Sequence, residues 1–136
     1  MSRVPPALAA KVRSRAGERC EYCHLRPAWT VLPFQIDHII AQQHKGATDE
    51  ANLAFACLRC NGRKGPNLSG IDPVSGEITP LFHPRRDAWK EHFEWHNSWL
   101  FGRTARARAT IQVLGINDPD VILTRESLML EGHDFA

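Results

Sequence analysis

Hydrophobic side chains follow a helical spacing at the start of the chain and gather into short runs further on. In residues 5–17, PPALAAKVRSRAG, apolar positions recur four apart, Pro6 suits a first helical turn, and Gly17 can end a helix. Residues 29–41, WTVLPFQIDHIIA, are rich in β-branched and aromatic side chains, which favours a strand that is broken near Pro33. The pattern therefore predicts a helix and then a strand.

The central region alternates between polar and apolar segments. Residues 42–52, QQHKGATDEAN, predict a polar loop, and residues 53–57, LAFAC, predict a second short strand. Residues 58–65, LRCNGRKG, have the length and composition of one to two helical turns. The predicted order in this region is strand, loop, strand and helix.

The C-terminal half has a different amino-acid composition. Residues 65–86 are full of Gly, Pro and Ser and predict mostly turns. Residues 92–101, HFEWHNSWLF, predict a strand or a hairpin. A capped helix is expected over residues 104–115, with Thr104 as the cap, and a last helix over residues 118–132.

Three of the four tryptophans lie in this half, at Trp89, Trp95 and Trp99. Exposed aromatic rings can stack on nucleobases, but aromatic residues at alternating positions more often belong to a core. We therefore expect these side chains to be core residues.

Length and composition favour one domain over residues 1–136, in which residues 67–136, of different composition, form a C-terminal extension. The sequence contains no run of about 18 apolar residues, so we expect no membrane partner. Four basic residues interrupt the N-terminal region, which lacks the apolar segment of a signal peptide and predicts a cytoplasmic protein. The net charge is +2, yet residues 117–136 hold five acidic residues against one arginine, so basic residues dominate elsewhere and favour a nucleic-acid partner.

The cysteines form two Cys-x-x-Cys pairs, Cys20/Cys23 and Cys57/Cys60, with none left over. Two such pairs can supply the tetrahedral set of four thiolates that zinc prefers, at Zn–S distances of about 2.3 Å. A pair of disulfides is the first alternative, but the absence of a secretion signal argues against it. A thioredoxin-like dithiol is the second, and it does not explain two copies. We predict a structural zinc ion with a filled coordination sphere.

Between and beside these pairs lie Asp37, His38, Asn52 and Asn61. With IDHIIA, DEANLAFACLRCNGRKG and the two cysteine pairs, the sequence resembles the HNH endonuclease family, whose core is a ββα-metal finger. The resemblance covers about residues 18–66. The segments LFHPRRDAWKEHFEWH and GRTARARATIQVLGIN are also similar to a bacterial branch of HNH proteins.

The resemblance implies a role for each of these residues. His38 matches the general base that activates water, and Asp37 matches the neighbouring metal-binding carboxylate. Asn52 matches the central asparagine, which holds the loop and orients the base. Asn61 matches the last motif position, where many members have a histidine; an asparagine there binds the metal in the nicking domain of RNA-guided DNA nucleases. Oxygen ligands at Asp37 and Asn61 favour Mg²⁺ or Mn²⁺ as the catalytic cation, and each residue taken alone has an ordinary structural explanation.

Further polar residues are weaker candidates for contacts with nucleic acid. They lie in the predicted loop, on the short helix, and in LFHPRRD, where the alternative is solvent exposure or pairing with local carboxylates. These candidates are His44, Arg59, Arg63, Lys64, His83, Arg85 and Arg86.

The sequence therefore predicts an α+β protein: a ββα-metal core with structural zinc, flanked by an N-terminal helix and a C-terminal extension of hairpin and helix. The expected function is metal-dependent hydrolysis of phosphodiester bonds in DNA, with RNA not excluded, by a monomer or homodimer. One alternative is a non-catalytic zinc-stabilised module that binds nucleic acid or protein. A redox or zinc-sensing switch is a third, which reversible zinc loss under mild oxidant would favour.

Overall fold

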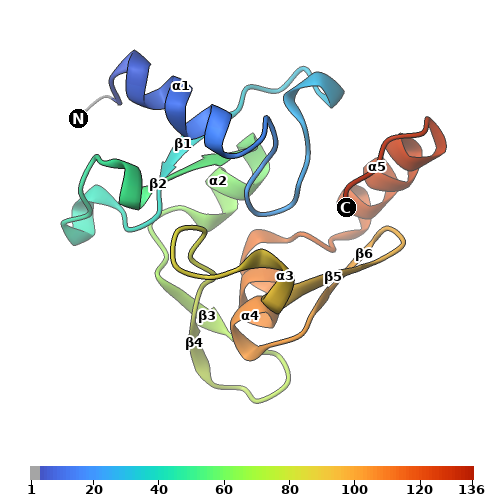
Figure 1. Cartoon of the computed structure of the whole chain (residues 1–136). Coiled ribbons are helices and arrows are strands. Elements are labelled where there is room, and N and C mark those ends of the chain that lie inside the picture. Colours follow the sequence, from blue (N-terminus) through green and yellow to red (C-terminus); the bar gives the residue numbers. More distant parts are fainter. Residues whose placement is uncertain (1–3) are drawn as a thin grey trace. The chain divides into compact units, whose positions relative to one another are not determined.

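A computed structural model describes residues 4–136, which fall into two compact units. Unit 1 runs up to Pro66 and also includes His83–Arg86, whereas unit 2 comprises Asn67–Phe82 and Asp87–Ala136. Figure 1 shows unit 1 in blue to green and most of unit 2 in yellow to red. The expectation of a single domain over residues 1–136 remains a prediction.

Unit 1 has the predicted order of helix, strand, strand and helix. Its elements are α1 (Pro6–Arg15), the 3-10 turn η1 (Pro27–Trp29), β1 (Gln35–His38), the 3-10 turns η2 (Gln42–His44) and η3 (Glu50–Asn52), β2 (Leu53–Ala56) and α2 (Leu58–Lys64). Strands β1 and β2 pair antiparallel, with Gln35 opposite Ala56 and His38 opposite Leu53. The ββα order expected at the centre of an α+β fold is confirmed.

Helix α1 covers the two-stranded sheet through a small apolar core. Val12 on α1 packs with Leu53 and Phe55 on β2, and partly buried side chains such as Phe34 join them. The rings of Phe34 and Phe55 lie 4.9 Å apart. Alternate residues of a strand face opposite sides, but all four side chains of β2 are buried, so β2 is the central element of this unit.

The outer edge of β2 is occupied by polar groups instead of a third strand. The Arg15 guanidinium donates to the carbonyl of Leu53 at 2.7 Å, and the Glu21 carboxylate accepts from the amide of Phe55 at 2.7 Å. The Glu21 amide donates in turn to the Phe55 carbonyl at 2.9 Å. These bonds satisfy backbone groups that an open strand edge would expose.

Unit 2 contains two hairpins and three helices. Its elements are β3 (Ser69–Ile71), β4 (Ile78–Pro80), α3 (Trp89–His92), β5 (Phe93–His96), β6 (Trp99–Gly102), α4 (Ala105–Leu114) and α5 (Pro119–Leu130). Strand β3 pairs with β4 and β5 pairs with β6, both antiparallel. Helix α4 contacts β3, β4 and β6. A Cβ at Gly70 would lie 2.4 Å from the Val113 side chain, so the glycine permits the close approach of α4 to β3.

Two segments differ from the sequence-based prediction. The strand expected to begin at Trp29 starts only at Gln35, because the residues before Pro33 find no strand partner and Val31 is 100% exposed. The stretch predicted as turns over residues 65–86 contains the β3–β4 hairpin. The expected first helix, second strand, short helix, Trp-rich hairpin and last two helices are confirmed. Thr104 caps α4 by accepting from the amide of Ala107 at 3.1 Å.

Candidate active site and metal centre

All four cysteines meet in one buried cluster. None forms a disulfide, and their sulfur atoms all lie within 4.8 Å of one another. Four sulfur ligands at this spacing match the tetrahedral set that zinc prefers. The cluster therefore fits a structural metal such as zinc. Among the described residues it is the one group of three or more Cys, His, Asp or Glu ligands close enough to hold an ion.

Two tight turns present the thiols. In the first turn, the Cys20 amide donates to the Leu25 carbonyl at 2.8 Å, and His24 adopts the left-handed φ of 67° that the turn requires. In the second, Cys57 is the N-cap of α2, and its sulfur accepts from the amide of Cys60 at 3.4 Å. Each Cys-x-x-Cys pair thus directs two sulfurs to the same point.

The electrostatics of the cluster favour one anionic sulfur even without a metal. Hydrogen bonds from Cys20, Cys23 and Cys60 lower the pKa of the Cys57 thiol far below its usual value. Hydrogen bonding to Cys20, with burial, raises the pKa of Cys23 and of Cys60. Zinc ligation needs thiolates, and the lowered pKa of Cys57 favours that form.

Asn52 holds the two ends of the loop that connects β1 to β2. Its Oδ1 accepts from the amide of Ile40 at 2.9 Å, and its Nδ2 donates to the carbonyls of Ile40 at 3.0 Å and Ala47 at 2.8 Å. All of this side chain's hydrogen-bonding groups therefore contact backbone within the loop. The role in orienting the base that the resemblance implies for Asn52 stays a prediction.

Gly46 lets the loop close around Asn52. A Cβ at Gly46 would lie 1.7 Å from the Ile40 carbonyl oxygen and 2.8 Å from Asn52 Nδ2. No side chain can occupy that space, and backbone atoms cannot move aside as a flexible side chain can. The loop conformation beside His38 consequently depends on a glycine.

His38 is the last residue of β1 and is half-buried. Its Nε2 lies 2.8 Å from the hydroxyl oxygen of Thr48, on the loop that Asn52 holds. Sequence reasoning missed Thr48, which lies in no motif and whose only signal is its place in the loop between His38 and Asn52. The contact orients the His38 ring about its side-chain torsions.

Asp37 faces the opposite side of β1 from His38 and is 4% exposed. Tyr22 donates its hydroxyl to Asp37 Oδ2 at 2.8 Å, and the Lys64 ammonium lies 3.2 Å from Asp37 Oδ1. Burial raises the pKa of Asp37, and the Lys64 charge and the Tyr22 hydrogen bond oppose that rise. Burial, together with the Asp37 charge, raises the pKa of Tyr22 well above its usual value, so the phenol remains a donor.

Asn61 lies on α2 and meets the same strand. Its amide nitrogen hydrogen-bonds the side-chain oxygen of Gln35 on β1. Gln35 and Asp37 are two residues apart on the strand and share a face, while Asn61 and Lys64 are three apart on the helix and share a side. The structure thus brings Asp37 and Asn61 to one β1–α2 face and His38 to the other face of β1.

Of the weaker candidates on the loop and on α2, His44 and Arg63 are exposed and Arg59 is partly buried. His44 Nε2 lies 3.1 Å from the carbonyl oxygen of Pro66. Lys64 differs from expectation: it is 2% exposed and paired with Asp37, so it is not a surface contact for nucleic acid in this conformation. Its position on the inner side of α2, three residues after Asn61, explains the difference.

The segment His83–Arg86 also differs from a simple basic clamp. His83 is buried, and its Nδ1 accepts from the amide of Arg85 at 3.2 Å. Arg85 forms an ion pair with Glu21. Burial and the charge of Arg15 lower the pKa of Arg85 to about 10, which leaves it charged at neutral pH. Arg86 is exposed, so it is the residue of this segment that remains available to solvent.

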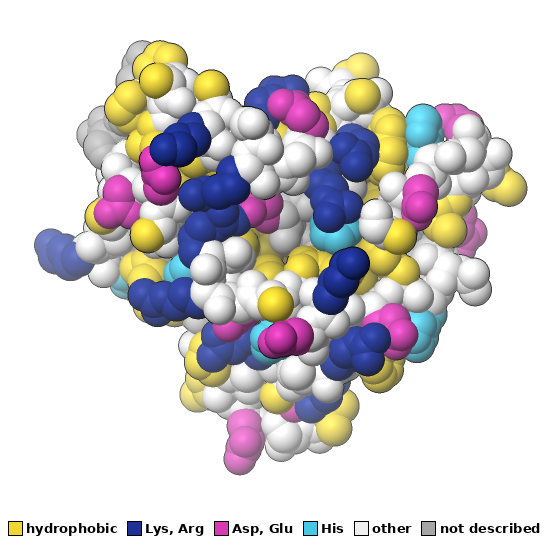
Figure 2. All heavy atoms as spheres, viewed as in Figure 1, with side chains coloured by type: hydrophobic (Ala, Val, Ile, Leu, Met, Phe, Trp, Pro, Cys, Tyr) yellow, Lys and Arg dark blue, Asp and Glu magenta, His cyan; other side chains and the backbone are white. Residues whose placement is uncertain are grey.

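Basic side chains are not segregated on the visible surface. Figure 2 shows Lys and Arg side chains over the face in view, with acidic side chains among them. Several are in ion pairs, including Lys11 with Glu50 at 2.6 Å and Arg106 with Asp87 at 2.9 Å. Charge alone therefore does not identify a nucleic-acid interface.

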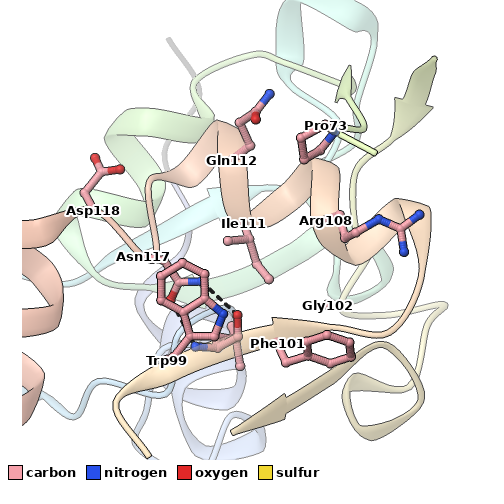
Figure 3. A pocket seen from close by; sticks show the side chains of 10 residues that line it. Pro73, Trp99, Phe101, Gly102, Arg108, Ile111, Gln112, Asn117 and Asp118 are labelled. Carbon is pink, nitrogen blue, oxygen red and sulfur yellow. Dashed lines mark hydrogen bonds between the residues drawn. The ribbon is translucent and has the colours of Figure 1, made fainter. Parts of the chain in front are cut away.

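A cavity of about 440 Å³ lies in unit 2, and none of its lining residues is among those that the sequence assigned to a site. Figure 3 shows Trp99 and Ile111 at its wall, with Asn117 hydrogen-bonded to the backbone of Leu100 behind them. Arg108, which also lines it, is engaged by Asp72 at 2.9 Å. Trp99 is 50% exposed, so one of the three tryptophans expected in the core is on the surface.

Comparisons with known proteins agree with the first unit's geometry. Residues 20–67 match the model of the HNH endonuclease family. Over 117 residues, 85% of its length, the chain is 24% identical to the Septu protein PtuB of Bacillus thuringiensis. The chain spans 43% of the length of that relative.

No solved structure matches the chain at a significant level. Within residues 4–136, none of the helices combines the length and the apolar character needed to cross a membrane. The family match covers both cysteine pairs and all of Asp37, His38, Asn52 and Asn61.

Proposed function

Since residues 20–67 form an HNH endonuclease domain, we propose that the protein hydrolyses phosphodiester bonds in DNA with His38 as the general base. The observation that carries the proposal is the arrangement at the end of β1. There His38 contacts Thr48 on a loop that Asn52 holds at both ends. A neutral imidazole can accept a proton from water.

In this proposal Thr48 engages one nitrogen of His38 and leaves the other for the attacking water. Its hydroxyl oxygen lies 2.8 Å from Nε2. If that oxygen accepts a hydrogen bond from Nε2–H, the lone pair on Nδ1 is the base. In this proposal Asn52 does not touch substrate: it keeps the loop, and therefore Thr48, at the distance that His38 requires.

A divalent cation fits the oxygen donors on the β1–α2 face; because His38, the last residue of β1, lies on the other face, a phosphate that meets both would lie across the end of the strand. Mg²⁺ and Mn²⁺ prefer carboxylate and amide oxygens, which Asp37 and Asn61 provide, with the Gln35 amide beside Asn61. The Lys64 ammonium, 3.2 Å from the Asp37 carboxylate, marks a position that already accepts positive charge. When bound, such a cation supplies charge neutralisation at the phosphate and at the leaving 3′ oxygen.

The proposal also covers contacts with the substrate, the number of strands cut and the location of the protein. His44, Arg59, Arg63 and Arg86 are candidates for contacts with the phosphate backbone, with DNA as the preferred substrate and RNA as an alternative. A monomer has one such site and would nick one strand, and cleavage of both strands would need a homodimer or a second binding event. We place the activity in the cytoplasm, as the sequence predicts.

Nicking of supercoiled plasmid tests the proposal. Purified, zinc-loaded protein is incubated with Mg²⁺ or Mn²⁺, beside His38→Ala and a matched control, His133→Ala, which alters a half-buried histidine near the C-terminus, outside residues 20–67. We expect the wild type and the control to nick, and His38→Ala to lose at least about a hundredfold in rate while it stays folded and binds DNA. Full activity in His38→Ala would contradict the assignment of the base.

The alternative, a non-catalytic nucleic-acid-binding module, has one observation in its favour. Both oxygens of Asp37 already have partners, Tyr22 and Lys64, which is the arrangement expected of a structural carboxylate. Retained DNA binding with no nicking in either metal by folded, zinc-loaded wild type would favour this alternative.

A further inference from the structure

Lys64 is the most deeply buried lysine in the described chain, with 2% exposure, and it contacts two residues of the proposed site. Its ammonium donates to Asp37 Oδ1 at 3.2 Å and to the backbone carbonyl of His38 at 3.2 Å. On the far side of the carboxylate, Tyr22 donates at 2.8 Å. One side chain therefore contacts both the carboxylate expected to bind a metal and the backbone of the expected base.

The burial of a lysine beside Asp37 has a physical reason. A buried carboxylate is costly unless a positive charge or hydrogen bonds compensate it. Tyr22 is neutral, so within the described residues Lys64 is the cation that contacts Asp37. The ammonium also ties α2 to the end of β1, since it bridges a side chain and a carbonyl of that strand.

The position of the ammonium bears directly on metal binding. A divalent cation bound to Asp37 would lie within a few ångströms of Lys64 Nζ if the lysine kept its place, and two positive charges at that separation repel strongly in a buried site. A flexible four-carbon side chain can instead move away. The Asp37 carboxylate can therefore hold either the Lys64 ammonium or a divalent cation close to it, but not both.

We propose that Lys64 is a resident cation that competes with the divalent metal for Asp37. In the absence of metal it neutralises the carboxylate and holds the end of β1 that carries His38. Metal binding requires that the ammonium leaves Asp37. This inference rests on the proposed function, because it concerns the cation that the nuclease reaction would use.

The competition predicts that loss of the lysine charge strengthens metal binding. Lys64→Met keeps most of the apolar length of the side chain and removes the ammonium. We expect its affinity for Mn²⁺ to exceed that of the wild type by about tenfold or more, since removal of one nearby positive charge is worth at least that factor. Lys90→Met, which changes an exposed lysine outside the site, is the control and should bind Mn²⁺ as the wild type does.

The experiment measures free Mn²⁺ by electron paramagnetic resonance in titrations of zinc-loaded protein, together with the midpoint of thermal unfolding at each concentration. Asp37→Asn/Lys64→Met removes both charges and therefore leaves no buried ion unpaired. We expect Mn²⁺ to raise the unfolding temperature of Lys64→Met more than that of the wild type, and not to raise that of the double variant. A Lys64→Met protein that folds only with Mn²⁺ would support the proposal equally.

Two results would overturn it. The first is an equal affinity for Mn²⁺ in Lys64→Met and the wild type. The second is a Lys64→Met protein that stays unfolded with Mn²⁺ while the double variant folds, because a metal then cannot replace the ammonium. Plasmid nicking by the wild type is a separate measurement: nicking with either result means that the competition fails and the proposed function stands.

Discussion

The two units are stabilised by different means. In unit 1, the cluster that joins helix and sheet is small, with Val12, Leu53 and Phe55 as its buried members. Much of the remaining interior is polar or metal-binding: the four cysteines, the Asp37–Lys64 pair and the Asn52 side chain. In unit 2, aromatic rings meet in a chain of contacts in which Phe93 lies 5.1 Å from both Phe82 and Trp89.

This difference explains why the candidate site lies in unit 1. Buried polar groups need specific partners, so unit 1 holds several side chains at defined distances, which catalysis requires. Apolar contacts are less directional, and they give unit 2 stability without arranging reactive groups. We infer that unit 1 depends on its metal and its polar contacts, whereas unit 2 depends on aromatic packing together with a few buried polar contacts such as Asp72 with Arg108.

Loss of zinc is the perturbation with the largest expected effect, and it tests this comparison directly. Cys57→Ser removes one of the four sulfurs and, because a structural zinc site contributes folding energy outright, should release the metal and unfold unit 1. Hydrogen exchange with mass spectrometry on the full chain should show loss of protection in β1, β2 and α2 before β6 and α4. Atomic absorption on the same sample measures the zinc content.

Two outcomes of that experiment would be informative in other ways. Simultaneous loss of protection in both units would show that they unfold as one cooperative domain, as the sequence predicted for residues 1–136. An unchanged melting temperature in Cys57→Ser would contradict the structural role of the metal. Ser98→Ala, in a turn of unit 2, is the control for effects on zinc content and protection that any single substitution could cause.

The contrast between the units also explains what could be predicted from the sequence. The spacing of the cysteine pairs is a local signal, and the cluster that it predicted at Cys20, Cys23, Cys57 and Cys60 is confirmed. The Asp-His pair and the two asparagines are local signals as well. Helix caps are local as well, so Thr104 could be assigned in advance. Local sequence signals therefore predicted most of the fold of unit 1 and the helices of unit 2.

Long-range contacts could not be predicted in the same way. The partner of Asp37 is Lys64, 27 residues away, and a lysine in a basic stretch gives no sign that it will be buried. The β3–β4 hairpin lies in a stretch whose Gly and Pro content favoured turns, and its pairing depends on packing against α4. Thr48 contacts His38 only because Asn52 and Gly46 shape the loop between them.

Arg125 offers a smaller perturbation, confined to unit 2. Its guanidinium donates to the carbonyl of Ile116 at 2.9 Å and lies 4.9 Å from the centroid of the Trp95 ring. Arg125→Met keeps apolar volume but leaves buried carbonyls without a donor, at a cost of about 2–4 kcal/mol in the free energy of unfolding. Urea denaturation followed by tryptophan fluorescence measures it.

Arg103→Met is the matched control, since its arginine is about half exposed and pairs with Glu94 on the surface. Its expected cost is below about 1 kcal/mol. Zinc content should be unchanged in both variants. Release of zinc by Arg125→Met would mean that packing in unit 2 also supports the metal centre, which would weaken the division drawn between the units.

Thr48→Val is expected to have the smallest effect on folding and to separate positioning from structure within unit 1. Valine has the shape of threonine without the hydroxyl, so His38 loses the contact at 2.8 Å and is free to adopt either tautomer. We expect kcat for nicking to fall by about tenfold, which is less than the roughly hundredfold or larger contribution of a general base because the base itself remains, with KM and the melting temperature nearly unchanged. Thr48→Ser retains the hydroxyl and should restore the rate. Equal rates in Thr48→Val and the wild type would show that the loop positions His38 through its backbone alone, and the role assigned to Asn52 would then not pass through Thr48.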